Sequence, residues 1–277
     1  MSSKGRSYLP LVGWLLAGGV PAAQAQAELR AQVYSVSDKG PAASFTVPQV
    51  KLPSAAATAR LNRSLIRLLL SGNETDSLAS LPRQLQQAAR SCCYDQDAHH
   101  WQVGQGQVGC SYEVLLNSQG LLSLAYTFDI MGAYSWEQTN HATFDLRTGR
   151  QLSLADVVAD PPTRLRQRMR RAVSLRLGEA LAQTQQGYAD DTATISYVAQ
   201  QFKWNWLTHQ SAAGEEVDLT EFALTPGQLL LFYRVGFPHV AMNFEPDDTY
   251  RFAYRTLQLQ PLLQPLWRAR LTSKPKI

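Results

Sequence analysis

Residues 111–128, SYEVLLNSQGLLSLAYTF, decide the fold of this chain. Two runs rich in apolar and aromatic residues flank the polar sequence NSQG at residues 117–120, whose glycine is free to adopt a positive φ. This pattern predicts an antiparallel hairpin. Residues 141–146 (HATFDL) form a third run, and the turn sequence RTGR follows at residues 147–150. Together the three runs predict an antiparallel meander.

The last third of the chain adds a long helix and further strands. Residues 163–183 carry apolar side chains at four-residue spacing, which predicts a helix that packs one face on the sheet. Strands are expected at residues 222–224, 228–235 and 250–254, and the strongly apolar second run is typical of a central strand. The predicted fold is therefore α+β, an antiparallel sheet with helices packed on one face.

A smaller strand and helix module is expected in front of this domain. Residues 31–37 and 45–52 read as strands, and Ser54 is placed to cap a helix with a leucine face. A second helical stripe runs from residue 78 to residue 88, and residues 92–109 read as a loop. We predict an N-terminal module at residues 28–109 and an α+β domain at residues 110–267.

The first 25 residues have the features of a cleavable signal peptide. Lys4 and Arg6 precede a short apolar run at residues 11–20, and A-x-A cleavage patterns follow. The apolar run is about half of the ~20 residues that span a bilayer, so we expect no stable membrane anchor. The protein is predicted to be exported and to be periplasmic or extracellular.

Composition excludes some classes of partner. The net charge of +4 is modest, and the basic residues do not occur with an aromatic platform or a nucleic-acid-binding motif, so nucleic acid is not expected as a partner. We find no paired-cysteine zinc pattern, no phosphate-binding glycine loop and no nucleophile elbow. No cofactor and no metal are expected.

Three cysteines fit an oxidising compartment, where disulfides persist. Cys110 is expected to pair with Cys93, with Cys92 as the competitor, which leaves one spare thiol. A metal cluster that adds His99 and His100 is the alternative, but its spacing matches no finger pattern. The compartment favours the disulfide.

Several motifs together resemble a known extracytoplasmic domain. Residues 121–124 (LLSL), 144–150 (FDLRTGR) and 152–157 (LSLADV) match in order and spacing, as does the TPG sequence at residues 225–227 before an apolar strand. The stretch at residues 110–265 resembles the domain of unknown function shared by the RsiV anti-sigma factor and the PdaC peptidoglycan deacetylase.

The resemblance implies an α+β binding module outside the cytoplasm, which captures lysozyme in RsiV-type proteins and accompanies a catalytic domain in PdaC-type proteins. We expect neither an anti-sigma architecture nor a deacetylase domain in this chain. Relatives often carry a Gly-Gly-Ala-His turn where this chain has Met131-Gly132-Ala133-Tyr134. We therefore expect this chain to share the fold of that family, and we do not carry over the family's ligand.

Two groups of side chains are candidates for ligand binding. Aromatic residues predicted on loops or edges are able to stack on sugar rings or to anchor a protein, and an extended Trp204 and Trp206 would share one face. Arginines around the stripe of the long helix offer a basic face to an anionic partner. Core packing and a solvated helix face are the alternatives. The candidates are Tyr134, Trp136, Arg164, Arg168, Arg171, Trp204 and Trp206.

We predict a non-catalytic envelope protein that binds a protein ligand, such as a lysozyme-like protein, or a peptidoglycan fragment. The alternative is a hydrolase acting on a cell-wall or secreted substrate. Its one candidate for acid or base chemistry is His239, in a loop near Glu245 and Asp247. A loop histidine with solvated neighbours explains the same sequence.

Overall fold

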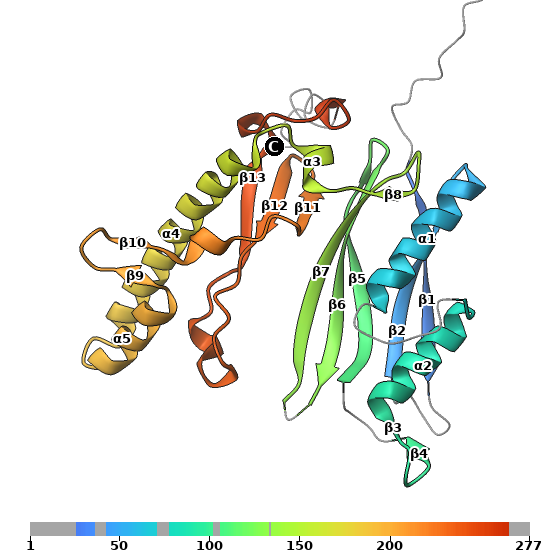
Figure 1. Ribbon diagram of the computed structural model, residues 1–277, viewed down its shortest axis with the longest axis horizontal. Coiled ribbons are helices and arrows are strands. Elements are labelled where there is room, and N and C mark those ends of the chain that lie inside the picture. The colour runs from blue at the N-terminus through green and yellow to red at the C-terminus, as the bar shows by residue number, and fades with distance from the viewer. Residues whose placement is uncertain (1–25, 37–42, 71–77, 102–105, 133, 266–277) are drawn as a thin grey trace, which may run out of the picture.

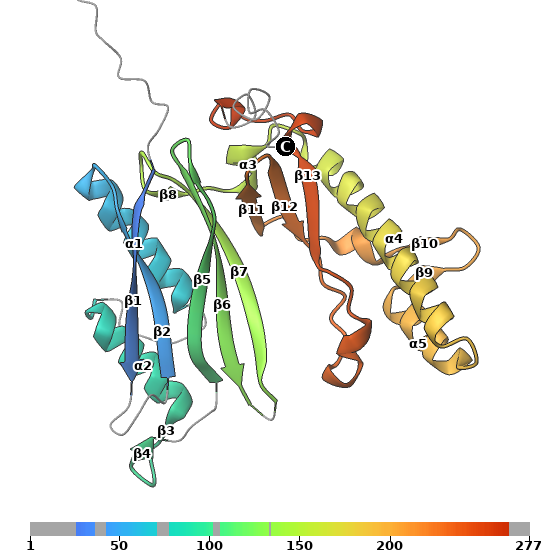
Figure 2. The same cartoon turned by 180° about the vertical axis from the view of Figure 1, so that it is seen from behind.

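The computed structural model describes residues 26–36, 43–70, 78–101, 106–132 and 134–265. The predicted signal peptide lies outside these ranges, so its cleavage and the export that it implies stay predictions. The described part of the chain has the predicted α+β fold, whose layers are visible from two opposite sides (Figures 1 and 2). Within these ranges, no helix combines the length and the apolar character needed to cross a membrane.

A six-stranded sheet in the order β1-β2-β5-β6-β7-β8 forms the first layer. Strands β5, β6 and β7 are the predicted antiparallel meander, and the turn from β5 to β6 contains Gln119 and Gly120, both at positive φ. The hairpin prediction is thus confirmed. The strands of this sheet are β1 (Glu28–Val36), β2 (Ala43–Lys51), β5 (Gly106–Ser118), β6 (Leu121–Met131), β7 (Trp136–Asp145) and β8 (Arg150–Gln151).

The N-terminal strands join the meander through a parallel pairing of β2 with β5. Ser44 lies opposite Gly109, and Phe45 lies opposite Cys110. The predicted boundary between residues 109 and 110 therefore falls inside β5. Strands from both sides of this boundary share one sheet and contribute side chains to one core.

Two helices, α1 (Ala55–Leu69) and α2 (Leu81–Cys93), cover one face of this sheet (Figure 1). The predicted cap is present, because the Ser54 hydroxyl accepts a hydrogen bond from the Ala57 N–H at 3.3 Å. Leu61 and Leu65 of α1 are buried in one cluster with Phe144 of β7. The apolar stripe predicted for this helix therefore packs on the sheet.

A smaller antiparallel sheet lies on the other side of the six-stranded sheet. Its strands are β11 (Phe222–Thr225), β12 (Gln228–Phe232) and β13 (Thr249–Ala253), and β12 is central as predicted. The Leu224 N–H of β11 donates to the buried Ser123 hydroxyl of β6 at 3.0 Å, and that hydroxyl lies 3.0 Å from the Thr143 hydroxyl. These two hydroxyls satisfy polar groups between the two sheets.

The long helix α4 (Pro162–Gly187) confirms the predicted element but packs elsewhere than predicted. Its stripe was expected on the meander, whereas it packs mainly among side chains from the small sheet and from α5 (Thr192–Gln201). Since β11 occupies the face of the meander on this side, α4 forms an outer layer (Figure 2). The buried stripe consists of Leu165, Met169, Val173, Leu177 and Leu181.

Short elements complete the described chain. They are β3 (Tyr94–Asp95), β4 (His100–Trp101), α3 (Leu154–Val157), β9 (Trp204–Asn205), β10 (Gln210–Ser211) and the 3-10 turns Ala213–Glu216, His239–Phe244 and Tyr254–Thr256. Part of the predicted loop at residues 92–109 is therefore ordered as the end of α2, the β3-β4 hairpin and the start of β5.

Cys110 is a buried free thiol in β5. Its Sγ donates to the Thr46 carbonyl oxygen at 3.5 Å, and burial raises the pKa of the thiol to about 12. The side chains of Cys92 and Cys93 lie outside the described residues. The structure thus gives no support to the predicted disulfide. Where side chains are described, no three His, Cys, Asp or Glu residues converge as metal ligands would.

The first turn of α3 carries a pH-dependent contribution to stability. The Arg150 guanidinium, together with the hydroxyl and N–H of Ser153, holds the pKa of the Asp156 carboxyl well below its usual range. Its contribution is present above the ordinary Asp pKa of about 4 and is lost as the pH falls through the folded-state value.

We expect Asp156→Asn to lower the free energy of unfolding by about 1 kcal/mol at neutral pH, as loss of a cap does. The difference from the wild type should shrink as the pH falls below the ordinary Asp pKa of about 4 toward the lowered folded-state pKa, because the wild-type carboxylate is then progressively protonated. Urea denaturation of both proteins across this range measures it. A difference that stays constant with pH would show that the charge of Asp156 is not responsible.

Candidate functional site

The predicted binding residues Tyr134 and Trp136 line a groove between the β6-β7 turn and the segment that follows β12. The groove has a volume of about 980 Å³. The ring of Tyr134 stacks on that of His239, with centroids 4.3 Å apart and planes 14° apart. The fold thus brings together the turn that departs from the family pattern and the histidine that was the candidate for acid or base chemistry.

Large apolar side chains are unusually exposed in this groove. Tyr134 is 61% exposed and Trp136 is 48% exposed, and Met131 and Met242 are also exposed. Asp129, Glu137 and Arg234 provide charged groups beside them. A mixture of tyrosine, tryptophan, methionine and arginine is typical of protein interfaces rather than of ordinary surface.

A second hollow of about 430 Å³ shares Trp136 and Arg234 with the groove and continues along β7. At its far end, the His141 Nδ1 lies 2.7 Å from the Glu221 carboxylate, and the His141 ring stacks on Phe232 at a centroid distance of 3.8 Å. His141 also donates its backbone N–H to Glu221 at 3.1 Å. We call the two hollows together the β7 groove.

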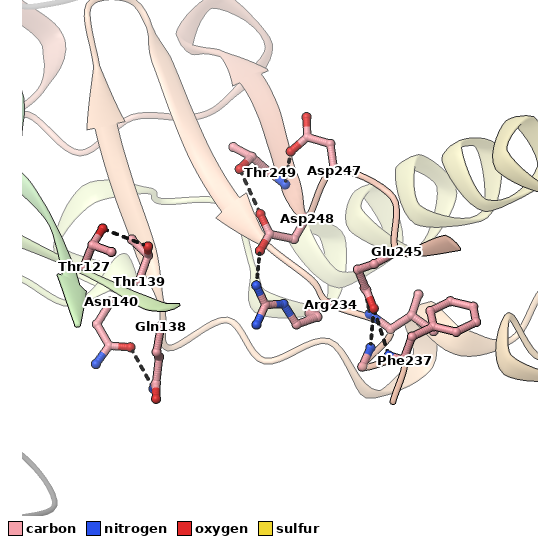
Figure 3. Close-up of polar contacts among 12 residues, drawn as sticks. Thr127, Gln138, Thr139, Asn140, Arg234, Phe237, Glu245, Asp247, Asp248 and Thr249 are labelled. Atoms are coloured by element: carbon pink, nitrogen blue, oxygen red, sulfur yellow. Dashed lines mark hydrogen bonds and ion pairs between the residues drawn. The ribbon is translucent and has the colours of Figure 1, made fainter. Parts of the chain in front are cut away.

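The wall opposite β7 is shaped by Glu245 (Figure 3). Its carboxylate accepts hydrogen bonds from the backbone N–H groups of Val235, Gly236 and Phe237, at 2.7, 3.0 and 2.9 Å. Nearby, a guanidinium nitrogen of Arg234 lies 3.8 Å from the Asp248 carboxylate. The loop after β12 is therefore held by polar contacts of its own residues.

These contacts occupy the two carboxylates that the sequence suggested as partners of His239. The sequence placed Glu245 and Asp247 near it as partners for acid or base chemistry. Glu245 instead holds its own loop, and Asp247 accepts from the Thr249 N–H at 2.9 Å and pairs with Arg251 at 3.3 Å. The described contact of the His239 ring is the stack on Tyr134.

Two of the predicted arginines lie at the start of α4 and serve the fold. Arg164 and Arg168 approach the fully buried Asp160 carboxylate at 3.3 and 3.9 Å. Arg168 also donates to the Thr256 carbonyl oxygen. These side chains tie α4 to the C-terminal segment. The sequence does not show which carboxylate they meet, so a binding face and a structural role were both open at that point.

Arg171 and Trp204 line a separate cavity of about 740 Å³ between α4 and the β9-β10 hairpin. The Trp204 indole lies against α4, where a Cβ at Gly178 would lie 2.8 Å from the ring. Trp206 is 48% exposed and does not line this cavity. The two indoles do not form the predicted platform, because Trp204 packs against the core.

Sequence reasoning missed the methionines and Arg234 of the β7 groove. Met131 ends β6, and Met242 lies in the 3-10 turn that begins at His239. An exposed methionine at the end of a strand or in a turn has no periodic signal. Their clustering arises from contacts between distant segments.

The sequence matches no protein-family model, and it matches none of the curated proteins. Among solved structures, the chain is similar to a DUF3298 family protein from Pseudomonas aeruginosa PAO1, with 15% identity and a TM-score of 0.49, over 86% of this chain and 96% of that one. It is also similar to a member of the DUF3298 family from Bacteroides fragilis NCTC 9343, with 14% identity and a TM-score of 0.43, over 91% of this chain and 98% of that one. These structural neighbours belong to a domain family of unknown function, and neither description names a ligand or an activity.

Proposed function

We propose that this chain is an exported, non-catalytic binding protein and that its ligand is a protein held in the β7 groove. The resemblance to the RsiV and PdaC extracytoplasmic domain belongs to this proposal, since it implies a binding module outside the cytoplasm. The observation that carries the proposal is the gathering of exposed Met131, Tyr134, Trp136 and Met242 beside Arg234 in one groove.

Exposed apolar patches of this kind mark interaction sites, because solvation of large apolar side chains is unfavourable without a partner. Tyrosine, tryptophan and arginine supply most of the residues that dominate protein-protein affinity. Exposed methionines add an adaptable surface that fits partners of different shape. A protein ligand therefore explains the composition of the groove better than a peptidoglycan fragment does.

The test uses three defined probes: purified lysozyme, a set of purified muropeptides and a random library of linear peptides. We expect lysozyme or library peptides to bind the wild type and the double variant Tyr134→Ala/Trp136→Ala to lose at least about tenfold in affinity, as truncation of two interface aromatics does. Trp206→Ala is the matched control, since this tryptophan has the same exposed fraction as Trp136 but lies outside the groove. Calorimetry measures the binding of lysozyme and muropeptides, and selection with counter-selection against the double variant tests the library.

Three outcomes contradict the proposal. Binding of muropeptides alone would assign the groove to a cell-wall ligand. A new product after incubation with muropeptides, detected by mass spectrometry and lost in His239→Ala, would establish the hydrolase alternative. Equal binding by the wild type and the double variant would place the ligand site elsewhere.

A further inference from the structure

The β7 groove contains an unpaired strand edge. β7 pairs with β6 over its full length, but β8 covers the other edge of β7 only at Phe144 and Asp145. In the described sheet, no strand pairs with this edge between Trp136 and Thr143. In this stretch, Trp136 and residues 138–141 line the second hollow of the groove, and Glu137 lines the first.

The direction of the free backbone groups follows from two hydrogen bonds. The His141 N–H points away from β6, since it donates to Glu221, and the Thr143 carbonyl points the same way, since it accepts from the Leu152 N–H at 2.8 Å. Backbone direction alternates along an antiparallel strand. The N–H and C=O groups of Glu137 and Thr139 therefore also point away from β6, into the groove.

The shape of the groove selects a single strand. Side chains of β7 form one wall, and Phe232, Arg234 and Asp248 lie on the other side of the same hollow. A second copy of this chain would bring the wall opposite its own β7 along with that edge, whereas a single extended segment brings only one strand to the groove.

Charge indicates the character of that segment. Four carboxylates line the groove, those of Asp129, Glu137, Glu221 and Asp248. Among the described lining residues, Arg234 is the one arginine and there is no lysine. Asp248 pairs with Arg234, and Glu221 pairs with His141. The exposed carboxylates of Asp129 and Glu137 are left to attract a cation.

We propose that the β7 groove binds an extended, basic polypeptide segment of its partner, which adds as a strand to the free edge of β7. This inference rests on the proposed function and specifies how the protein ligand is recognised. Backbone hydrogen bonds to Glu137 and Thr139 would supply affinity, and an apolar side chain of the segment would lie on the Tyr134 and Trp136 side of the groove.

The decisive experiment is an N-methyl scan of a selected peptide. A random linear library is selected on the wild-type protein and counter-selected against Tyr134→Ala/Trp136→Ala, and each backbone N–H of the best peptide is methylated in turn. Strand addition predicts that methylation weakens binding at least about tenfold at every second residue of the central segment and much less between them, since the backbone direction alternates. Groove-dependent binding without this period of two overturns strand addition and leaves the proposed function standing. A library that yields no groove-dependent peptide counts against both.

Three variants of the protein extend the test. Thr139→Pro removes an N–H that faces the groove and not β6, whereas Thr139→Val removes the hydroxyl and keeps the N–H. We expect the proline variant to bind the selected peptide at least about tenfold more weakly than the valine variant, with both folded by circular dichroism. Glu137→Gln should weaken binding and reduce its salt dependence, because it removes an attractive charge. Equal affinities of the Pro and Val variants, or an unchanged salt dependence in Glu137→Gln, would contradict the proposed mode.

Discussion

Gly149→Ala is expected to lower the free energy of unfolding by about 3–4 kcal/mol, close to the largest effects seen for single substitutions. Gly149 lies in the β7-β8 turn at φ +67°, where a side chain costs about 1–2 kcal/mol. A Cβ at this position would also lie 2.1 Å from the Ala57 carbonyl oxygen. Because that atom belongs to the first turn of α1, relief of the clash requires the helix to move away from the sheet.

Gly120→Ala is the matched control. Gly120 also has a positive φ, at +77°, but a Cβ there would meet no atom within 4 Å. It should therefore cost only about 1–2 kcal/mol, the conformational part alone. Guanidinium denaturation of the wild type, Gly149→Ala and Gly120→Ala measures the two losses in the free energy of unfolding. Equal losses for the two variants would mean that the contact between the β7-β8 turn and α1 is not tight.

Asp160→Ala is expected to cost about 2–3 kcal/mol, as loss of hydrogen bonds to a charged group does. The carboxylate is fully buried, accepts from the Gln258 N–H at 2.7 Å and lies 3.3 Å from Arg164. Alanine would leave that N–H without its acceptor and would remove the carboxylate that Arg164 and Arg168 approach. The C-terminal segment should then separate from α4 before the rest of the protein unfolds.

Asp160→Asn is the informative comparison, because asparagine keeps an oxygen for the Gln258 N–H and loses only the charge. We expect a loss of stability about half that of alanine, since a neutral acceptor still satisfies the amide. Chemical denaturation measures both variants, and hydrogen exchange at the Gln258 amide reports the local change. If this amide exchanges at the same rate in wild type and Asp160→Ala, the carboxylate does not hold the segment.

Local patterns predicted most elements of the fold. The β5-β6 hairpin follows from an apolar run on each side of a four-residue turn, and the stripe of α4 follows from helical spacing, so neither depends on distant residues. The parallel pairing of β2 with β5 could not be predicted, because it joins segments separated by α1 and α2. The layer on which α4 packs was predicted wrongly, because local patterns do not show that the small sheet lies between α4 and the meander.

The candidate site was predicted in part. Tyr134 and Trp136 were recognised as aromatic residues predicted on loops or edges, Tyr134 also from a turn that departs from the pattern of relatives, and both line the β7 groove. His239, which stacks on Tyr134, belongs to a loop distant in sequence, and no local pattern reveals this contact. Arg164 illustrates the opposite case, since a basic helix face looks the same in sequence whether a ligand or a buried Asp160 neutralises it.

The parallel pairing of β2 with β5 also constrains the order in which the chain can mature. Synthesis delivers β1, β2, α1 and α2 before β5, so the leucines of α1 at first have only two strands to cover them. The aromatic side chains Tyr126 and Phe144, which complete that core, come later still. β1, β2, α1 and α2 therefore cannot reach their final packing until the meander has emerged, and until then the apolar side chains that the meander covers stay exposed.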